Sequence, residues 1–132
     1  MTNGHCLCGQ TGWSSNGSAL WSAYCHCESC RRACGAPVAA FIGVSNGHWA
    51  WVGTPKTYAS SDHATRYFCG NCGSQLGYSS TKYPDEMHFL TASMVDPSPF
   101  APTLHVHYQE HLVWFDVDDD LPRRPGADAP YP

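Results

Sequence analysis

The sequence is poor in charged residues and has no basic stripe. Only 14% of its 132 residues are charged, and the formal net charge is -4. Adjacent basic residues occur only at Arg31–Arg32 and Arg123–Arg124, whereas nucleic-acid binding needs a basic patch that neutralises phosphates. We therefore predict no nucleic-acid partner. A surface with so few charges is compatible with burial against a second copy of the chain in a homodimer.

The sequence also lacks a run of about 18 apolar residues, the length that a membrane-spanning helix requires. Its first residues, MTNGHCLCGQTGW, have neither the positive nor the apolar segment of a secretion signal. We therefore predict a cytoplasmic protein with no membrane partner. Cysteines remain reduced in the cytoplasm, so a cysteine-rich chain there is expected to bind metal rather than to form disulfides.

No long segment shows the period of an amphipathic helix, and glycine or proline interrupts the chain every few residues. Between these breaks lie short runs rich in β-branched and aromatic residues, which predict a mainly β, antiparallel fold with little helix. One or two helical turns are expected at 28–33. The expected strands are 19–27, 37–44, 48–53, 65–70, 74–80, 87–95, 103–109 and 111–117.

The length and the hydrophobic content of 42% fit one ordinary globular domain. From residue 118 the sequence DDDLPRRPGADAPYP is first acidic and then rich in proline. Such a composition is typical of a peripheral or extended segment. We therefore predict a single zinc-binding domain over residues 1–117 and a proline-rich tail over 118–132.

Cysteine, in contrast, is abundant: seven of the eight cysteines fall into three groups. We call these groups the N-terminal pair (Cys6, Cys8), the middle triplet (Cys25, Cys27, Cys30) and the knuckle pair (Cys69, Cys72). Cysteines one or two residues apart can direct their sulfurs to one point, and the glycines of FCGNCGS allow the tight turn of a zinc knuckle. The pattern predicts metal binding, with Zn²⁺ as the ion.

The knuckle pair supplies only two ligands, so it needs a second pair. The N-terminal pair is the natural partner, which would complete a closed, four-cysteine structural zinc site. The middle triplet would then hold a second zinc ion with one open position, the arrangement of catalytic zinc. Spacing alone also allows other pairings, such as the first two cysteines of the triplet with the knuckle pair.

Five segments in order resemble the glutathione-dependent formaldehyde-activating (GFA), or centromere protein V-like, family. They are GHCLCG, YCHCESCRRACGAPVAAFIGV, RYFCGNCGSQLGY, DPSPFAPTLHVH and VWFDV, and they extend from Gly4 to about Asp116. The resemblance implies an Mss4-like fold, a β-tent of antiparallel sheets around two zinc sites. It also implies a structural zinc on the N-terminal and knuckle pairs and a catalytic zinc on the middle triplet.

The family's named reaction condenses glutathione with formaldehyde to S-hydroxymethylglutathione, and it is classed among carbon–sulfur lyases. The resemblance therefore implies a zinc-dependent enzyme that acts on a small thiol, such as glutathione, or on its aldehyde adduct. The alternative is a non-catalytic zinc-binding scaffold or interaction module of the same fold. A third interpretation is a redox sensor that uses Cys34 as a free thiol.

Cys34 departs from the family pattern, because serine or threonine is usual at its position. In a helix Cys30 and Cys34 share one face, so Cys34 could close the second site as a fourth ligand. The alternative is a small, buried thiol that replaces threonine.

Four further residues are candidates for the second site or its neighbourhood. Arg32, Arg66 and His105 are predicted to orient the substrate, Arg32 through its charge and the other two because they recur at these positions in the family that the sequence resembles. His26 lies between two cysteines and is expected to face away from the metal, since neighbouring side chains of a strand alternate.

Overall fold

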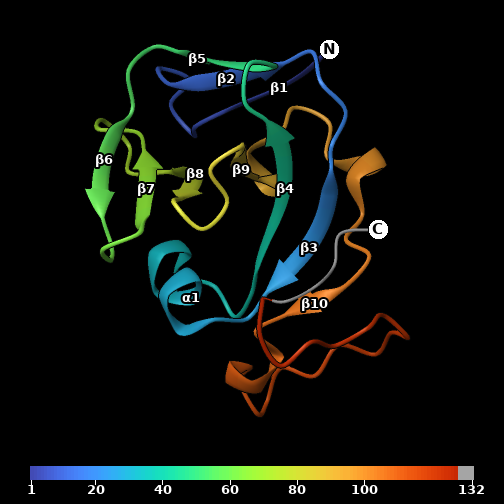
Figure 1. Ribbon diagram of the computed structural model, residues 1–132. Coiled ribbons are helices and arrows are strands. Elements are labelled where there is room, and N and C mark those ends of the chain that lie inside the picture. Colours follow the sequence, from blue (N-terminus) through green and yellow to red (C-terminus); the bar gives the residue numbers. More distant parts are fainter. Residues whose placement is uncertain (128–132) are drawn as a thin grey trace.

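The computed structural model describes residues 1–127, which form two β-sheets, one α-helix and three short 3₁₀ helices. Figure 1 shows the small sheet (β1, β2 and β5) at one end of the molecule. The helix and the C-terminal segment, which here means residues 107–127, lie at the opposite end. The prediction of a mainly β fold with little helix is confirmed. No helix in residues 1–127 is long and apolar enough to cross a membrane.

The small sheet joins three short strands in the order β1-β2-β5. The strands β1 (Thr2–His5) and β2 (Gly12–Ser15) form an antiparallel hairpin, and β5 (Trp49–Val52) pairs with β2 in antiparallel orientation. The turn between β1 and β2 carries the N-terminal cysteine pair, so this hairpin sets the position of both sulfurs.

The large sheet has the strand order β10-β3-β4-β9-β8-β7-β6. Its strands are β3 (Trp21–Cys25), β4 (Ala39–Ser45), β6 (Lys56–Ala59), β7 (Ala64–Phe68), β8 (Gln75–Ser80), β9 (Glu86–Leu90) and β10 (His105–Val106). The pairing is antiparallel except between β10 and β3. The chain returns to β10 through two 3₁₀ helices, η1 (Thr91–Ser93) and η2 (Ser98–Phe100), and a third, η3 (Tyr108–Glu110), follows it.

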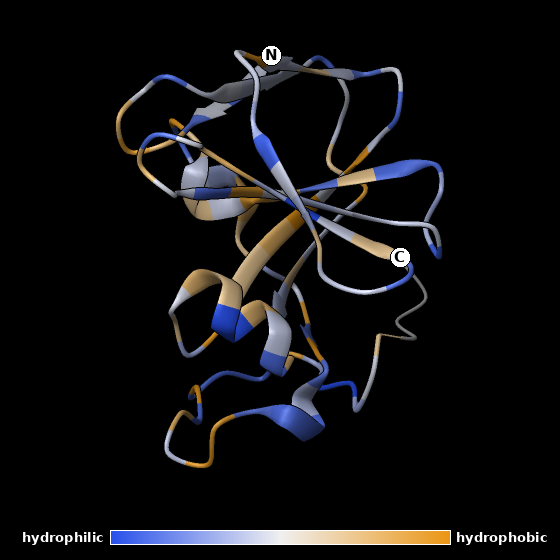
Figure 2. Cartoon of the chain, turned by 90° about the vertical axis from the view of Figure 1, so that its left-hand side faces the viewer, coloured by the Kyte–Doolittle hydropathy of each residue, from blue (hydrophilic) through white to orange (hydrophobic). Residues whose placement is uncertain are grey.

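A hydrophobic core lies between the two sheets. Trp13 of β2 stacks on Phe89 of β9 with 4.1 Å between the ring centroids, and both side chains are fully buried. Ile42, Val44, Met87 and Met94 complete this cluster. Burial of each such side chain contributes about 1.5–3 kcal/mol, so these contacts hold the small sheet on the large one. Figure 2 shows hydrophobic colours gathered on the interior strands and hydrophilic colours on many peripheral loops.

The single α-helix, α1 (Glu28–Cys34), follows β3 almost directly and confirms the helical turns predicted at 28–33. It begins at its N-cap Cys27, whose Sγ accepts a hydrogen bond from the backbone N of Cys30 at 3.3 Å. It ends at Gly35, whose left-handed φ of 61° favours glycine. One sulfur of the middle triplet therefore also fixes the start of the helix.

The predicted strand at 111–117 is wrong. This segment turns at Val113 and Trp114, both exposed, and forms no strand. At the edge beside β10, the chain segment around Pro122–Arg124 takes the place that this strand would need. Within the predicted antiparallel fold, the pairing of β10 with β3 is parallel, and the sequence did not predict β1, β2 or β6.

The described part of the C-terminal segment runs alongside β10. The backbone N of His105 donates to the oxygen of Pro122 at 2.7 Å, and Arg124 N donates to the oxygen of His105 at 2.8 Å. Tyr108 N also donates to the oxygen of Arg124 at 2.8 Å. The predicted tail is thus attached to the large sheet in this stretch, whereas residues 128–132 lie outside the described part.

Candidate metal sites and cavity

The N-terminal pair and the knuckle pair converge on one point. Gly9 and Gly73 have φ angles of 80° and 78°, a conformation that favours glycine. It lets the backbone turn back toward the neighbouring cysteines at each of the two places. As a result, four sulfurs from two distant turns lie within 4.8 Å of one another: those of Cys6, Cys8, Cys69 and Cys72.

Backbone N–H groups point at these sulfurs. Thr11 N donates to Cys6 Sγ at 3.3 Å. Cys72 N donates to Cys69 Sγ at 3.5 Å, and this hydrogen bond is the main reason that the pKa of Cys69 is lowered. Hydrogen bonds from Ser74 lower the pKa of Cys72 to about 5. Burial raises the pKa of the Cys6 thiol. The four convergent sulfurs fit a tetrahedral Zn²⁺ site, in which protein ligands fill every position.

The middle triplet forms a second group at the end of β3. Cys25 ends the strand, Cys27 caps α1, and Cys30 lies within the first turn of the helix. Their three sulfurs lie within 4.8 Å of one another, and no other histidine, cysteine or carboxylate of residues 1–127 joins the group. Cys25 and Cys30 are buried, whereas Cys27 is half-buried and gives the group an accessible side. Three thiolates fit Zn²⁺ with one position left for another ligand.

Hydrogen bonds among these thiols shift their pKa values in opposite directions. Those from Cys25 and Cys30 lower the pKa of Cys27 far below its usual range, whereas the bond to Cys27 raises the pKa of Cys25. Arg66 lies beside the group and donates from Nη2 to Ser29 Oγ at 3.0 Å and to Cys30 Sγ at 3.6 Å. Three thiolates on a divalent ion leave one surplus negative charge, which this buried guanidinium is placed to offset.

The middle triplet lies in the wall of a cavity of about 310 Å³. This volume accommodates a small organic molecule. Much of the cavity wall is apolar. Most of its apolar residues come from the strands of the large sheet or lie directly beside them: Trp21, Ala23, Phe41, Tyr78, Leu104 and Val106. The polar side chains that line the cavity include His63, Arg66, Lys82, His88, His107 and Glu110.

The structure brings only one of the three predicted orienting residues to the cavity. Arg66 is 6% exposed and lines it next to Cys30. Arg32 instead lies on the exposed side of α1, where its Nε is 2.9 Å from Glu28 Oε1. His105 is fully buried and does not line the cavity.

His105 belongs to a buried hydrogen-bonded chain behind the triplet. His26 Nε2 lies 2.7 Å from His105 Nδ1, and His105 Nε2 lies 3.1 Å from Asp119 Oδ2. Because a carboxylate only accepts, His105 carries its proton on Nε2, and His26 donates to its other nitrogen. Burial lowers the pKa of His26 to about 4, which keeps this ring neutral. His26 thus packs against β10 rather than joining the sulfurs.

Cys34 lies one helical turn after Cys30, but its sulfur does not belong to the three-sulfur group. Burial raises the pKa of this thiol. Both observations favour a small thiol in place of threonine over a fourth metal ligand, although Cys34 is half-buried rather than buried.

Sequence reasoning missed most of the residues that line the cavity, among them Tyr78, Lys82, His88 and Glu110. A signal for two of them exists in the sheet register, because Tyr78 stands opposite both Arg66 and His88. Side chains at opposed positions share a face of a sheet. Alternation in the sequence does not reveal these partners, since it specifies neither the pairing nor which face carries the site.

The "Glutathione-dependent formaldehyde-activating enzyme" family model matches residues 1–110. An uncharacterized lyase of Schizosaccharomyces pombe is 35% identical over 91 residues, which are 67% of this chain. The match spans only 64% of the length of that yeast relative. A crystal structure of a Rhodobacter sphaeroides protein shares the fold, with a TM-score of 0.64 at 20% identity over 79% of this chain and 99% of that one. The resemblance is therefore confirmed, and the chain belongs to the GFA family.

Proposed function

We propose that this chain is a zinc-dependent carbon–sulfur lyase that acts on a small thiol or its aldehyde adduct, of the S-hydroxymethylglutathione type. The observation that carries the proposal is the middle triplet, three convergent sulfurs in the wall of a cavity. Family membership and the description of the yeast relative as a lyase support this class of activity.

The proposed reaction joins a thiol to an aldehyde. The S–H bond breaks, a C–S bond forms to the carbonyl carbon, and the proton ends on the former carbonyl oxygen; the lyase direction is the reverse. A zinc ion on the triplet supplies a Lewis acid that favours the thiolate, the nucleophilic form of the thiol, at neutral pH.

Residues of the chain itself provide the surroundings for this step. Arg66 places a positive charge next to Cys30, and its guanidinium lies 5.1 Å from the centre of the Tyr78 ring. This stacking on a cavity wall restricts the position of the guanidinium. Phe41 and Tyr78 present aromatic surface to the cavity and displace water from its wall, which strengthens the electrostatic interactions inside.

The two cysteine groups have different proposed tasks. The N-terminal and knuckle pairs hold a structural zinc ion, and the middle triplet holds the zinc ion that meets the substrate. None of the eight cysteines forms a disulfide. This state suits a reducing compartment, so we place the protein in the cytoplasm.

The test combines metal analysis with the rate of adduct formation from glutathione and isotope-labelled formaldehyde, followed by NMR. We expect two zinc ions per chain and a rate above that of the spontaneous condensation. Cys27→Ser should lose one zinc ion and the added rate, whereas the control Cys34→Ser should keep both. A protein with two zinc ions and no added rate, with glutathione and with other small thiols, would instead support the scaffold alternative.

A further inference from the structure

The turn that carries the middle triplet is held at His26, the residue between its first two cysteines. Neighbouring side chains of an extended chain alternate, so that of His26 points away from the sulfurs of Cys25 and Cys27. The backbone N of His26 donates to the oxygen of Val106 at 3.1 Å, and its oxygen accepts from Arg31 Nε at 3.1 Å. Contacts with β10 and with α1 therefore fix the backbone of this residue.

Two hydrogen bonds connect the side chain of His26 to a carboxylate of the C-terminal segment. His26 Nε2 lies 2.7 Å from His105 Nδ1, and His105 Nε2 lies 3.1 Å from Asp119 Oδ2. Both histidines are fully buried, so solvent does not compete for the bond between them. Asp119 lies beyond residues 1–110, the part of the chain that the family model matches. The matched part therefore contains the two histidines and lacks the carboxylate.

The carboxylate of Asp119 is itself held in place. Its Oδ1 accepts hydrogen bonds from Leu121 N and from Arg123 Nη1, both at 3.0 Å. Arg123 is fixed in turn, because its guanidinium lies 5.1 Å from the centre of the Tyr108 ring. Oδ1 is thus engaged by two donors, and Oδ2 is the nearer acceptor for His105.

The carboxylate determines the direction of both hydrogen bonds. Because it only accepts, His105 carries its proton on Nε2 and accepts a hydrogen bond from His26 Nε2 at its Nδ1. His26 Nδ1 is then without a proton, and this buried atom has no hydrogen-bond partner in residues 1–127. In the reverse direction the same nitrogen would carry a buried N–H without an acceptor, which is unfavourable.

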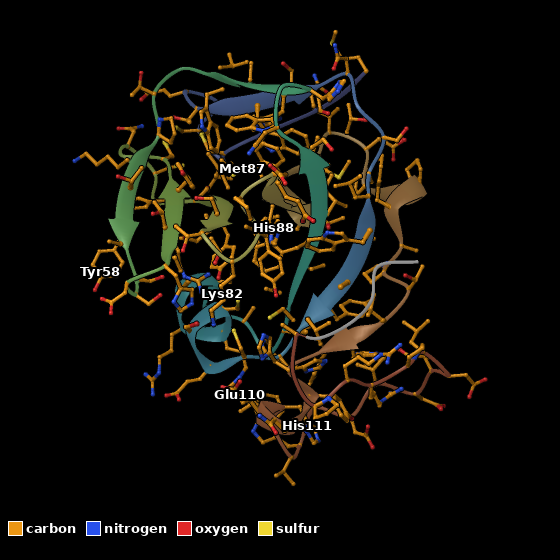
Figure 3. The ribbon with its side chains drawn as sticks, viewed as in Figure 1. Tyr58, Lys82, Met87, His88, Glu110 and His111 are labelled. Carbon is orange, nitrogen blue, oxygen red and sulfur yellow. The ribbon has the colours of Figure 1, made fainter. Side chains whose placement is uncertain are left out.

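Aromatic rings enclose His26 on the side of η3. The rings of Tyr108 and His111 lie 5.0 Å and 6.3 Å from that of His26 between centroids, and they stack on each other at 4.1 Å. Figure 3 shows His111 at the end of the molecule that carries α1. Because these rings leave the imidazole little room, a change in its hydrogen bond to His105 must move either the ring or the turn that bears it.

We propose that Asp119 is a positioning residue for the second metal site, the middle triplet. Through His105 it fixes the direction of the hydrogen bond that orients His26, and His26 holds the turn on which the sulfurs of Cys25 and Cys27 meet. Partners that orient metal ligands from outside the ligand set change metal affinity about 10–100-fold. The proposal depends on zinc at the triplet, which is part of the proposed function, but not on the substrate or the reaction.

Asp119→Asn tests this role, because it keeps the size of the side chain and changes which hydrogen bonds it can make. We expect zinc at the middle triplet to bind about tenfold more weakly and zinc at the four-cysteine group to bind as in the wild-type protein. Competition with a chromogenic chelator measures both affinities, and the unchanged four-cysteine group shows that the fold is intact. The matched control is Asp120→Asn, which removes the same charge from an exposed neighbour and should change neither affinity.

Nitrogen-15 NMR of the histidine rings gives a second readout, because it reports which ring nitrogen carries the proton. In Asp119→Asn the side-chain oxygen keeps its donors, Leu121 N and Arg123 Nη1, so the amide nitrogen faces His105 and donates to it. His105 should then carry its proton on Nδ1 instead of Nε2, and His26 should change in the same way. A general loss of stability would not cause this exchange. Protons that stay on the wild-type nitrogens in Asp119→Asn would overturn the proposal.

A double substitution shows whether Asp119 acts through the histidines. His105→Phe places a ring in the same space but interrupts the connection, so adding Asp119→Asn to it should not weaken zinc at the triplet further. Additive losses would overturn the proposal, since Asp119 would then act by another route. A wild-type protein without a second zinc ion contradicts the proposed function together with the positioning role. A second zinc ion whose affinity is unchanged in Asp119→Asn contradicts the positioning role alone.

Discussion

At the scale of single residues, Arg66 is the group that most directly balances the charge of the second metal site. Its guanidinium is buried and contacts both Cys30 Sγ and Ser29 Oγ. We expect Arg66→Gln to weaken zinc binding at the middle triplet about tenfold, the effect of losing one hydrogen bond to a charged group. Zinc at the four-cysteine group should be unaffected. Competition with a chromogenic chelator measures the two affinities.

Arg32→Gln is the matched control, because it removes the same charge from the exposed side of α1. Its zinc affinities should equal those of the wild-type protein. Equal weakening in both variants would show that net charge, rather than the contact with Cys30, determines the affinity.

The contacts of Glu86 lead us to expect that its contribution to the free energy of unfolding depends on pH. Burial would raise its pKa, but hydrogen bonds from His88 and Trp21 outweigh burial and lower the pKa below the usual 4.5. A carboxyl whose pKa is lower in the folded state stabilises the protein above the unfolded pKa and loses this contribution as the pH falls through the folded pKa. Glu86→Gln should therefore cost about 1–2 kcal/mol at pH 7.

The difference in the free energy of unfolding between the wild-type protein and Glu86→Gln should shrink as the pH falls below about 4.5. Urea unfolding at a series of pH values measures this difference. Protonation of the metal-binding cysteines affects both proteins alike and cancels in this difference. A difference that stays constant with pH would rule out the carboxylate of Glu86 as its source.

Sequence reasoning reached some site residues and not others, for physical reasons. The sulfurs of the three cysteine groups are found from spacing, because cysteines so close together share a turn. Arg66 was predicted as a candidate, but so were Arg32, which belongs to an exposed ion pair, and His105, which bonds to a buried histidine. Only the tertiary arrangement separates these three, because Arg32 is on the outer side of α1 and the other two are on strands.

At the scale of the strand, the close contact of β3 with β4 supports one end of the cavity. The indole of Trp21 lies over Gly43, and a Cβ at this position would lie 2.2 Å from Trp21 Nε1 and 2.4 Å from Cε2. Gly43→Ala must displace the indole, which then loses its hydrogen bond to Glu86. Overpacking of this kind costs about 1–3 kcal/mol, and urea unfolding should show the loss.

Gly126→Ala serves as the control, since a Cβ there has no atom within 4 Å. Its stability should match that of the wild-type protein. If Gly43→Ala is equally stable, the indole is free to move, and the orientation of His88 does not depend on it.

Whether a strand could be predicted from the sequence depended on how many apolar residues it contains. The strands β4 and β9 are rich in apolar residues and were predicted, whereas β1 (TNGH), β2 (GWSS) and β6 (KTYA) are short and largely polar or small. Tertiary pairing, rather than an apolar pattern, makes these three segments strands. The parallel approach of β10 to β3 could not be predicted either, because it depends on the long connection from β9.

At the scale of the whole molecule, the two metal sites differ in what they connect. The four-cysteine group joins the β1–β2 turn of the small sheet to the β7–β8 turn of the large sheet. The middle triplet instead lies within one short segment, from the end of β3 into α1. Loss of metal at the first site therefore frees two distant parts of the fold, and loss at the second frees one turn.

Because the two metal sites connect different parts of the fold, we expect opposite effects on folding from the same change, cysteine to serine, at Cys69 and at Cys27. A structural zinc site contributes about 10–16 kcal/mol of apparent binding free energy, as much as the whole stability of a typical domain, about 5–15 kcal/mol. Cys69→Ser should therefore abolish the cooperative thermal transition, measured by circular dichroism. Cys27→Ser should keep that transition and lose only the second metal ion, because the hydrophobic core around Trp13 and Phe89 does not involve the triplet. If both variants unfold, the triplet is structural too, and an open site devoted to chemistry is no longer tenable.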